Sequence, residues 1–223
     1  MPGTIAEALL LSLGVAISPI PILGVVALLL SERPRPTGLG FSGGWMGGIV
    51  VVVSAATAFA LFSDRLGDSG LLRQSAAAVG VVLGALAIAA GVAVWMLQPP
   101  GAEARQPRWL AALDQMSVRQ AVVLGAALSA VNPKNLLASV VAGLMIGWSG
   151  LSTQVIAASA AAFSLIASSS VLLPMLAFLL AGRAIRGRLT IVRDWLIRHN
   201  SRVVSLVLIV IGALLVVRGL SGA

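Results

Sequence analysis

The sequence predicts an all-α integral membrane protein with six transmembrane helices arranged as two inverted three-helix repeats. Of its 223 residues, 59% are hydrophobic and only 10% are charged, whereas soluble domains carry about 25% charged residues. The apolar residues form six runs that are long enough to cross about 30 Å of hydrocarbon. The first and fourth runs are interrupted by proline at corresponding places, which predicts two broken helices.

The six runs divide the chain into two repeats, residues 1–97 and 120–223. Between them, residues 98–119 contain three prolines and helically spaced apolar residues, which predicts a cytoplasmic linker with a short interfacial helix. Residues 183–202 combine many arginines with an apolar stripe of Ile185, Leu189, Val192 and Leu196. We therefore expect a basic interfacial helix there. The predicted spans lie at about 4–30, 38–62, 76–97, 120–148, 151–181 and 203–217.

An offset of 114 residues relates the two repeats. It places Ser18-Pro19-Ile20-Pro21 on Asn132-Pro133-Lys134-Asn135, and it places the second span on the fifth. Three spans per repeat is an odd number, so the repeats cross the membrane in opposite directions. In secondary transporters with this plan, the binding site lies at the midplane between interrupted helices.

Arginine predicts the orientation of the chain. The loops after the first, third and fifth spans contain eleven arginines, whereas the opposite side contains three. Positive residues stay cytoplasmic, so both termini are predicted to be external, in a multi-pass protein of the bacterial inner membrane. The arginines that give the chain its net charge of +8 are therefore expected to contact anionic membrane lipids and not nucleic acid.

Lys134 is the only lysine and the only charge deep inside an apolar run. A lysine at the centre of a span costs roughly 2.5–3.5 kcal/mol on insertion scales, and the seven acidic residues are expected in loops or near the membrane surface. Its partners are therefore expected among the carbonyls freed by Pro19, Pro21 and Pro133, neighbouring polar side chains, water or an anionic cargo. The alternative is a purely structural role, in which Lys134 only holds the two broken helices in place.

Three further side chains complete the predicted substrate site. Asn132 can cap the helix that begins at Pro133, Asn135 can satisfy an orphan backbone group, and Ser18 occupies the equivalent place in the first break. The three prolines are predicted to form the helix breaks and to gate the site. With no cysteine and one histidine, the sequence predicts neither a metal site nor a cofactor, and it argues against an enzyme.

These motifs give the sequence a resemblance to the lysine-exporter (LysE) superfamily, whose members have six short spans, a proline pair in the first span and Asn-Pro-Lys in the fourth. Ala16-Ile17-Ser18-Pro19-Ile20-Pro21 and Asn132-Pro133-Lys134-Asn135-Leu136 look most like the GAP (Sap-like) branch of bacterial glycolipid-addressing proteins. The branch implies help in moving glycolipids to the cell envelope. Ile-Pro stands where amino-acid exporters commonly have Gly-Pro, which argues against amino-acid cargo.

Three classes of function remain open from sequence alone. The leading one is a transporter, or transport accessory, that exports an envelope glycolipid or small anionic amphiphile by secondary transport. An amino-acid or small-metabolite exporter is one alternative, and a non-transporting scaffold for a larger lipid-export machinery is another. The glycine-rich second and third spans suit either a homodimer or packing within one chain.

Overall fold

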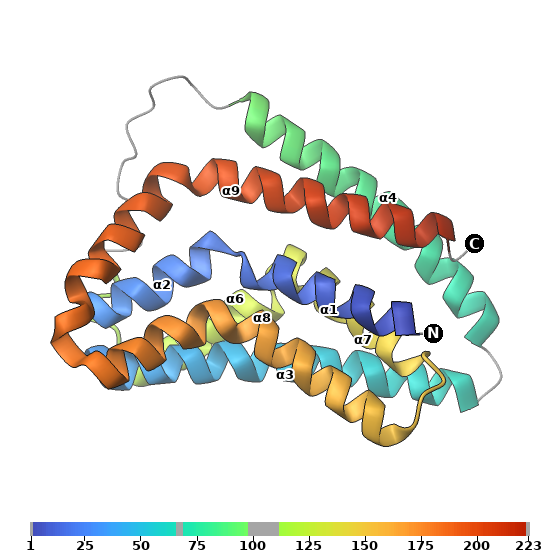
Figure 1. Ribbon diagram of the computed structural model, residues 1–223, viewed down its shortest axis with the longest axis horizontal. Helices are drawn as coiled ribbons and strands as arrows, with labels where there is room; N and C mark the ends of the chain where they lie inside the picture. Colours follow the sequence, from blue (N-terminus) through green and yellow to red (C-terminus); the bar gives the residue numbers. More distant parts are fainter. Residues whose placement is uncertain (1, 66–68, 98–111, 222–223) are drawn as a thin grey trace.

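The computed structural model describes residues 2–65, 69–97 and 112–221, and these residues form helices without any strand. The predicted all-α class is confirmed. Most helices lie along one long axis of the molecule (Figure 1). The elements are α1 (Pro2–Ala16), α2 (Pro19–Leu30), α3 (Pro34–Arg65), α4 (Ser69–Met96), α6 (Val118–Ala130), α7 (Pro133–Gly147), α8 (Thr153–Ala181), the short 3-10 helix η1 (Gly182–Ile185) and α9 (Arg186–Ser221).

Both predicted helix breaks are present. The axis bends by 51° between α1 and α2 and by 64° between α6 and α7. Pro19 and Pro133 each occupy the first helical position after the break, where the missing N–H of proline does no harm. Pro174, by contrast, lies inside α8 without ending it.

The apolar helices fit a multi-pass membrane protein. Among the described residues, two helical stretches are long and apolar enough to cross a membrane, Pro34–Arg65 and Thr153–Val217, and the two bent pairs raise this number to four. Figure 1 shows that the second stretch doubles back, because α8 runs toward one end of the molecule and α9 returns. The apolar part of α4, Gly80–Met96, is shorter. Six crossings therefore remain a prediction.

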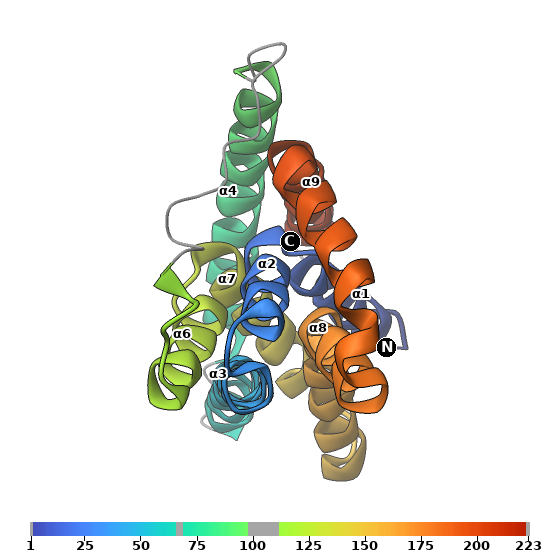
Figure 2. The ribbon, with the colours of Figure 1, turned by 90° about the vertical axis from the view of Figure 1, so that its left-hand side faces the viewer.

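Helix α3 is the central packing partner, since it contacts α6, α7 and α8. Its side chains Phe41, Trp45 and Ile49 are fully buried. On the other side of the molecule, α4 packs along α9, and Figure 2 shows this pair beside the remaining helices. The two breaks lie between these layers, where α1 contacts α7 and α8.

The basic segment 183–202 is helical, but it is the beginning of a longer element. Helix α9 continues from Arg186 to Ser221, so this segment and the last predicted span form one helix. Two residues of the predicted stripe, Leu189 and Leu196, are 4% and 5% exposed and pack against the protein, whereas Val192 is 41% exposed. The linker helix predicted within 98–119 falls mostly on residues 98–111, outside the described residues.

Candidate functional site

The first helix break frees backbone carbonyls in α1. Ser18 precedes α2 with an extended backbone (φ −117°, ψ 105°), and its N–H donates to the carbonyl of Ala16 at 2.8 Å. In a continuous helix this N–H would bond to Gly14, four residues back. Pro19 and Pro21 have no N–H to offer the preceding turn. The carbonyl of Gly14 is thus left without a helical partner.

The second break is capped by its own asparagines. Asn132 precedes α7, and its Oδ1 accepts a hydrogen bond from the N–H of Lys134 at 3.1 Å. Asn135 is fully buried, and its Nδ2 donates to the carbonyl of Leu128 at 3.1 Å. Leu128 lies four residues before Asn132, so it is the carbonyl that the break removes from the helical pattern.

Lys134 connects the two breaks. Its Nζ donates to the carbonyl of Gly14 at 2.7 Å, across 120 residues of sequence. Of the partners that the sequence left open, the structure thus shows a carbonyl of the first break. Within the described part of the chain, no carboxylate forms an ion pair with Lys134. An ammonium group has three donors, and Gly14 accepts from one of them.

The remaining predicted residues divide into two groups. Ser18, Pro19 and Pro21 are buried at the first break, and Pro133 is exposed at the second. Among the described residues, no hydrogen bond joins Ser18 to Lys134, Asn132 or Asn135. The side chains of Lys134, Asn132 and Asn135 therefore form hydrogen bonds at the two breaks. The hydrogen bond described for Ser18 is formed by its backbone N–H.

Two faces of α7 have different neighbours. Asn135, Ser139 and Gly143 follow one another at intervals of four residues, and a Cβ at Gly143 would lie 2.7 Å from the carbonyl of Val53 in α3. Lys134 instead faces α1. Asn135 Oδ1 and Ser139 Oγ on the α3-facing side are buried and have no partner among the described protein atoms.

Sequence reasoning missed Gly14 and Ser139. Gly14 could have been found by counting four residues back from the residue before Pro19, because that carbonyl always loses its helical donor. Ser139 could have been found as the residue one turn after Asn135 on the same face. The indole Nε1 of Trp45 and the hydroxyls of Ser42 and Ser168 are also buried without protein partners, and no local pattern marks them.

The site contains no metal-binding cluster within the described ranges, since no group of three or more His, Cys, Asp or Glu residues lies together there. Its chemistry consists of one ammonium group, two amides, hydroxyls, and the two backbone carbonyls that accept from Lys134 and Asn135. Such groups bind and orient a polar or anionic molecule.

A family model described as "Sap, sulfolipid-1-addressing protein" matches residues 8–221. No curated protein and no solved structure matches the chain. The match supports the resemblance to the glycolipid-addressing branch. Placement in the wider lysine-exporter superfamily remains a prediction.

Proposed function

Because the chain belongs to the Sap, sulfolipid-1-addressing protein, family, we propose that it exports, or helps to export, an envelope glycolipid or small anionic amphiphile. The cargo passes a site where the two helix breaks meet, near the middle of the bacterial inner membrane. The observation that supports this proposal most directly is the 2.7 Å hydrogen bond from Lys134 Nζ to the carbonyl of Gly14. It joins the N-terminal turn of α7 to the freed end of α1.

The two breaks behave as equivalent halves of an inverted repeat. Gly14 and Leu128 are 114 residues apart, the same offset that relates Pro19 to Pro133. Each of these carbonyls loses its helical donor, and each receives a side-chain donor from α7 instead. Packing supports the same relation, because α3 contacts α6 and α7 while α8 contacts α1 and α2. This pattern is expected of a 3+3 repeat with its site at the midplane.

Lys134 has two roles in this proposal. One N–H of its ammonium group holds α1 against α7, and the others receive the anionic group of the cargo. Asn135 and Ser139 lie on the adjacent, α3-facing side of α7 and are fully buried, so in this proposal they reach hydroxyls of the headgroup only when α7 moves away from α3. The low polarity around the site strengthens each of these interactions relative to water.

The proposed orientation places both termini outside the cell. The first turn of α1 and the last turn of α9 lie at the same end of the molecule (Figure 1), as an even number of crossings requires. The arginines of α9 begin at the opposite end, where Arg186 Nη2 donates to the carbonyl of Ser31 at 3.4 Å. That end faces the cytoplasm in this proposal, by the distribution of positive residues.

Reconstitution tests the function directly. We expect the purified chain in liposomes to accelerate transbilayer movement of a fluorescent sulfated glycolipid, measured by the fraction of probe that external dithionite bleaches. A phosphatidylcholine probe with the same fluorophore is the control for bilayer leakage, and a labelled basic amino acid tests the alternative exporter class. If the protein alone moves none of these compounds, the scaffold role in a larger export machinery replaces transport.

Cysteine pairs test the shared site. The chain has no cysteine, so Gly14→Cys with Lys134→Cys reports only on the designed pair. Lys134 reaches the carbonyl of Gly14 through the full length of its side chain, and a side chain at position 14 meets Ile211 of α9. We therefore expect a flexible bifunctional reagent longer than a lysine side chain to link this pair and to change the electrophoretic mobility of the protein. A control pair, Gly14→Cys with Leu173→Cys, should stay unlinked because Leu173 lies on an exposed face of α8. Equal linking of both pairs would contradict the shared site.

A further inference from the structure

Five buried polar groups of α3, α7 and α8 have no hydrogen-bond partner among the described protein atoms. They are the indole Nε1 of Trp45, the Oδ1 of Asn135 and the hydroxyls of Ser42, Ser139 and Ser168. Each of the five residues is at most 3% exposed. Buried polar groups nearly always have a partner in folded proteins, so several that have none within the protein indicate a bound ligand or bound water. We refer to these five groups as the polar cluster.

Trp45 and Ser168 lie at the same level where α3 packs against α8. The two helices run in opposite directions (Figure 1). A Cβ at Gly38 of α3 would lie 2.8 Å from the Sδ atom of Met175 in α8. Trp45 follows Gly38 by seven residues and Ser168 precedes Met175 by seven, which is about two turns along each helix. Both residues therefore stay on the faces through which the two helices touch.

Asn135 reaches the same level from α7. Its Nδ2 donates to the carbonyl of Leu128, and a Cβ at Gly48 of α3 would overlap the hydroxyl of the adjacent Ser129. Gly48 follows Trp45 by about one turn. The two remaining serines of the polar cluster lie one turn away on the same faces of α3 and α7. Three helices thus bring a donor, an acceptor and several hydroxyls together in the core.

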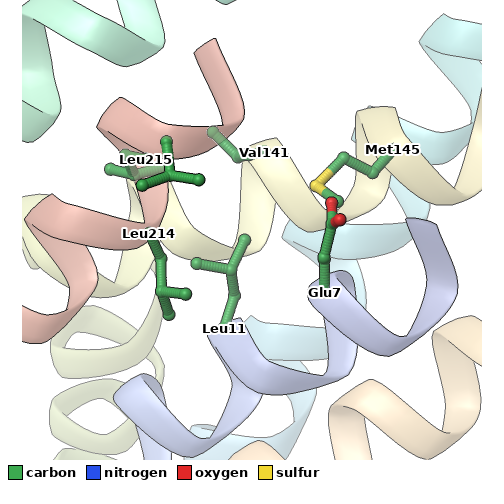
Figure 3. A pocket seen from close by; sticks show the side chains of 7 residues that line it. Glu7, Leu11, Val141, Met145, Leu214 and Leu215 are labelled. Carbon is green, nitrogen blue, oxygen red and sulfur yellow. The ribbon is translucent and has the colours of Figure 1, made fainter. Parts of the chain in front are cut away.

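The polar cluster lies on a different face of α7 from Lys134. Val141 and Met145 follow Lys134 by seven and eleven residues, so these three side chains share one face. On that face Val141 and Met145 line a small, largely apolar pocket together with Leu11 of α1 (Figure 3). Asn135 belongs to the α3-facing side instead. The ammonium group and the polar cluster therefore offer different chemistry to two neighbouring parts of the interior.

Ser168 differs from other buried serines of α8. The hydroxyls of Ser159 and Ser164 donate to carbonyls four residues earlier, at 2.7 and 2.8 Å, as serines inside helices commonly do. The hydroxyl of Ser168 forms no such bond, although the same carbonyl position precedes it. It is therefore available to a group that lies outside its own helix.

The donors and acceptors of the polar cluster select an uncharged ligand. The indole N–H of Trp45 can only donate, and the Oδ1 of Asn135 can only accept. A cation would meet the indole hydrogen and an anion would meet the amide oxygen, whereas a hydroxyl group accepts from the first and donates to the second. Helices α3, α7 and α8 are described in full, and their buried residues include no charged side chain. We infer that the polar cluster binds uncharged hydroxyl groups, those of water or of a glycolipid sugar.

The two sources of hydroxyl groups need different amounts of space. Water needs little, and about two molecules with roughly three hydrogen bonds each would satisfy the five groups. A sugar enters only with the movement of α7 away from α3, and its hydroxyls then replace the water while its anionic substituent meets Lys134. The sugar as a source rests on the proposed function, whereas water as a source does not.

Hydroxyl-radical labelling of the full-length protein in lipid nanodiscs tests the site. Short X-ray pulses convert water into hydroxyl radicals, so a bound water oxidises the side chains beside it, and mass spectrometry identifies them. Trp45 and Phe41 are both fully buried and lie one turn apart on α3. After correction for the reactivities of indole and phenyl rings, we expect at least fivefold more oxidation of Trp45. Equal oxidation of the two residues would overturn the inference.

Serine variants show whether the polar cluster holds the water. Ser168→Ala removes one of its ligands and should lower the oxidation of Trp45 at least twofold. Ser164→Ala is the matched control, since this serine of α8 is also buried but bonds to its own helix, and it should leave the oxidation unchanged. Ser42→Ala replaces Ser168→Ala if the latter does not fold. If the cluster variants that fold leave the oxidation of Trp45 unchanged, the inference is wrong.

Two added compounds distinguish water from a sugar. A sulfated alkyl glucoside should lower the oxidation of Trp45 if its sugar replaces the water, and should leave it unchanged if water alone binds; either result keeps the hydroxyl site. A larger decrease with an alkyl sulfate that has no sugar would show a site for anions and would overturn the assignment. Trp45 labelling in a protein that transports no probe contradicts only the proposed function. Lys134-dependent transport without Trp45 labelling contradicts only the hydroxyl site.

Discussion

Lys134→Ala is expected to abolish cargo movement per folded molecule while changing thermal stability little. The substitution removes a charge that costs roughly 2.5–3.5 kcal/mol to place at the centre of a span. It also removes the hydrogen bond to Gly14, and bonds to charged groups contribute about 1.5–3 kcal/mol. The two effects nearly cancel. The measurement is the initial rate of probe movement in liposomes, normalised to folded protein, with the midpoint of thermal unfolding from the same sample.

Three further substitutions at this position separate the charge from the bond. Lys134→Gln keeps an amide donor for Gly14 without the charge, so it should be stable and inactive. Lys134→Arg should be impaired, because a planar guanidinium does not replace a compact ammonium between helix ends. Lys134→Glu should show the lowest rate of cargo movement, because its carboxylate repels both the carbonyl of Gly14 and an anionic cargo. An active glutamine variant would mean that Lys134 has only a structural role and that the cargo binds elsewhere.

The helix breaks could be predicted from sequence because their cause is local. Proline lacks an N–H and crowds the preceding turn wherever it stands, so Pro19 and Pro133 marked both bends. Pro174 shows the limit of this rule, since α8 continues through it. The capping role of Asn132 was also local, because the side chain bonds to the N–H two residues later.

The partner of Lys134 could be narrowed but not identified. Because the sequence places no acidic residue at the depth of Lys134, an ion pair was not expected. The carbonyls freed by the helix breaks remained as one of several possible partners. Choosing Gly14 requires knowing that α1 lies against α7, which depends on packing across the whole bundle. The same holds for Leu189, which the stripe assigned to the membrane surface and the fold packs into the core.

The glycines of α3 were predicted as a packing surface without a partner. Four of them occur as two adjacent pairs, and only one member of each pair faces α6. A Cβ at Gly44 would overlap the backbone of Val122, and one at Gly48 would overlap the hydroxyl of Ser129, whereas Gly43 and Gly47 have nothing within 4 Å. From α6 the contact is reciprocal, because a Cβ at Gly125 would overlap the carbonyl of Phe41. The two helix backbones therefore touch.

Gly44→Ala is expected to destabilise the protein by roughly 1–3 kcal/mol, the usual range for an overpacked interior, and to lower its thermal midpoint by several degrees. The Val122 backbone cannot rotate away as a side chain would, so α6 must shift, and with it the break at Asn132. Transport per folded molecule should fall for the same reason. Gly43→Ala, one residue earlier on the same helix, is the matched control: it meets no atom and gains helix propensity of up to about 1 kcal/mol. Equal midpoints for the two variants would show that α3 and α6 do not touch at this position.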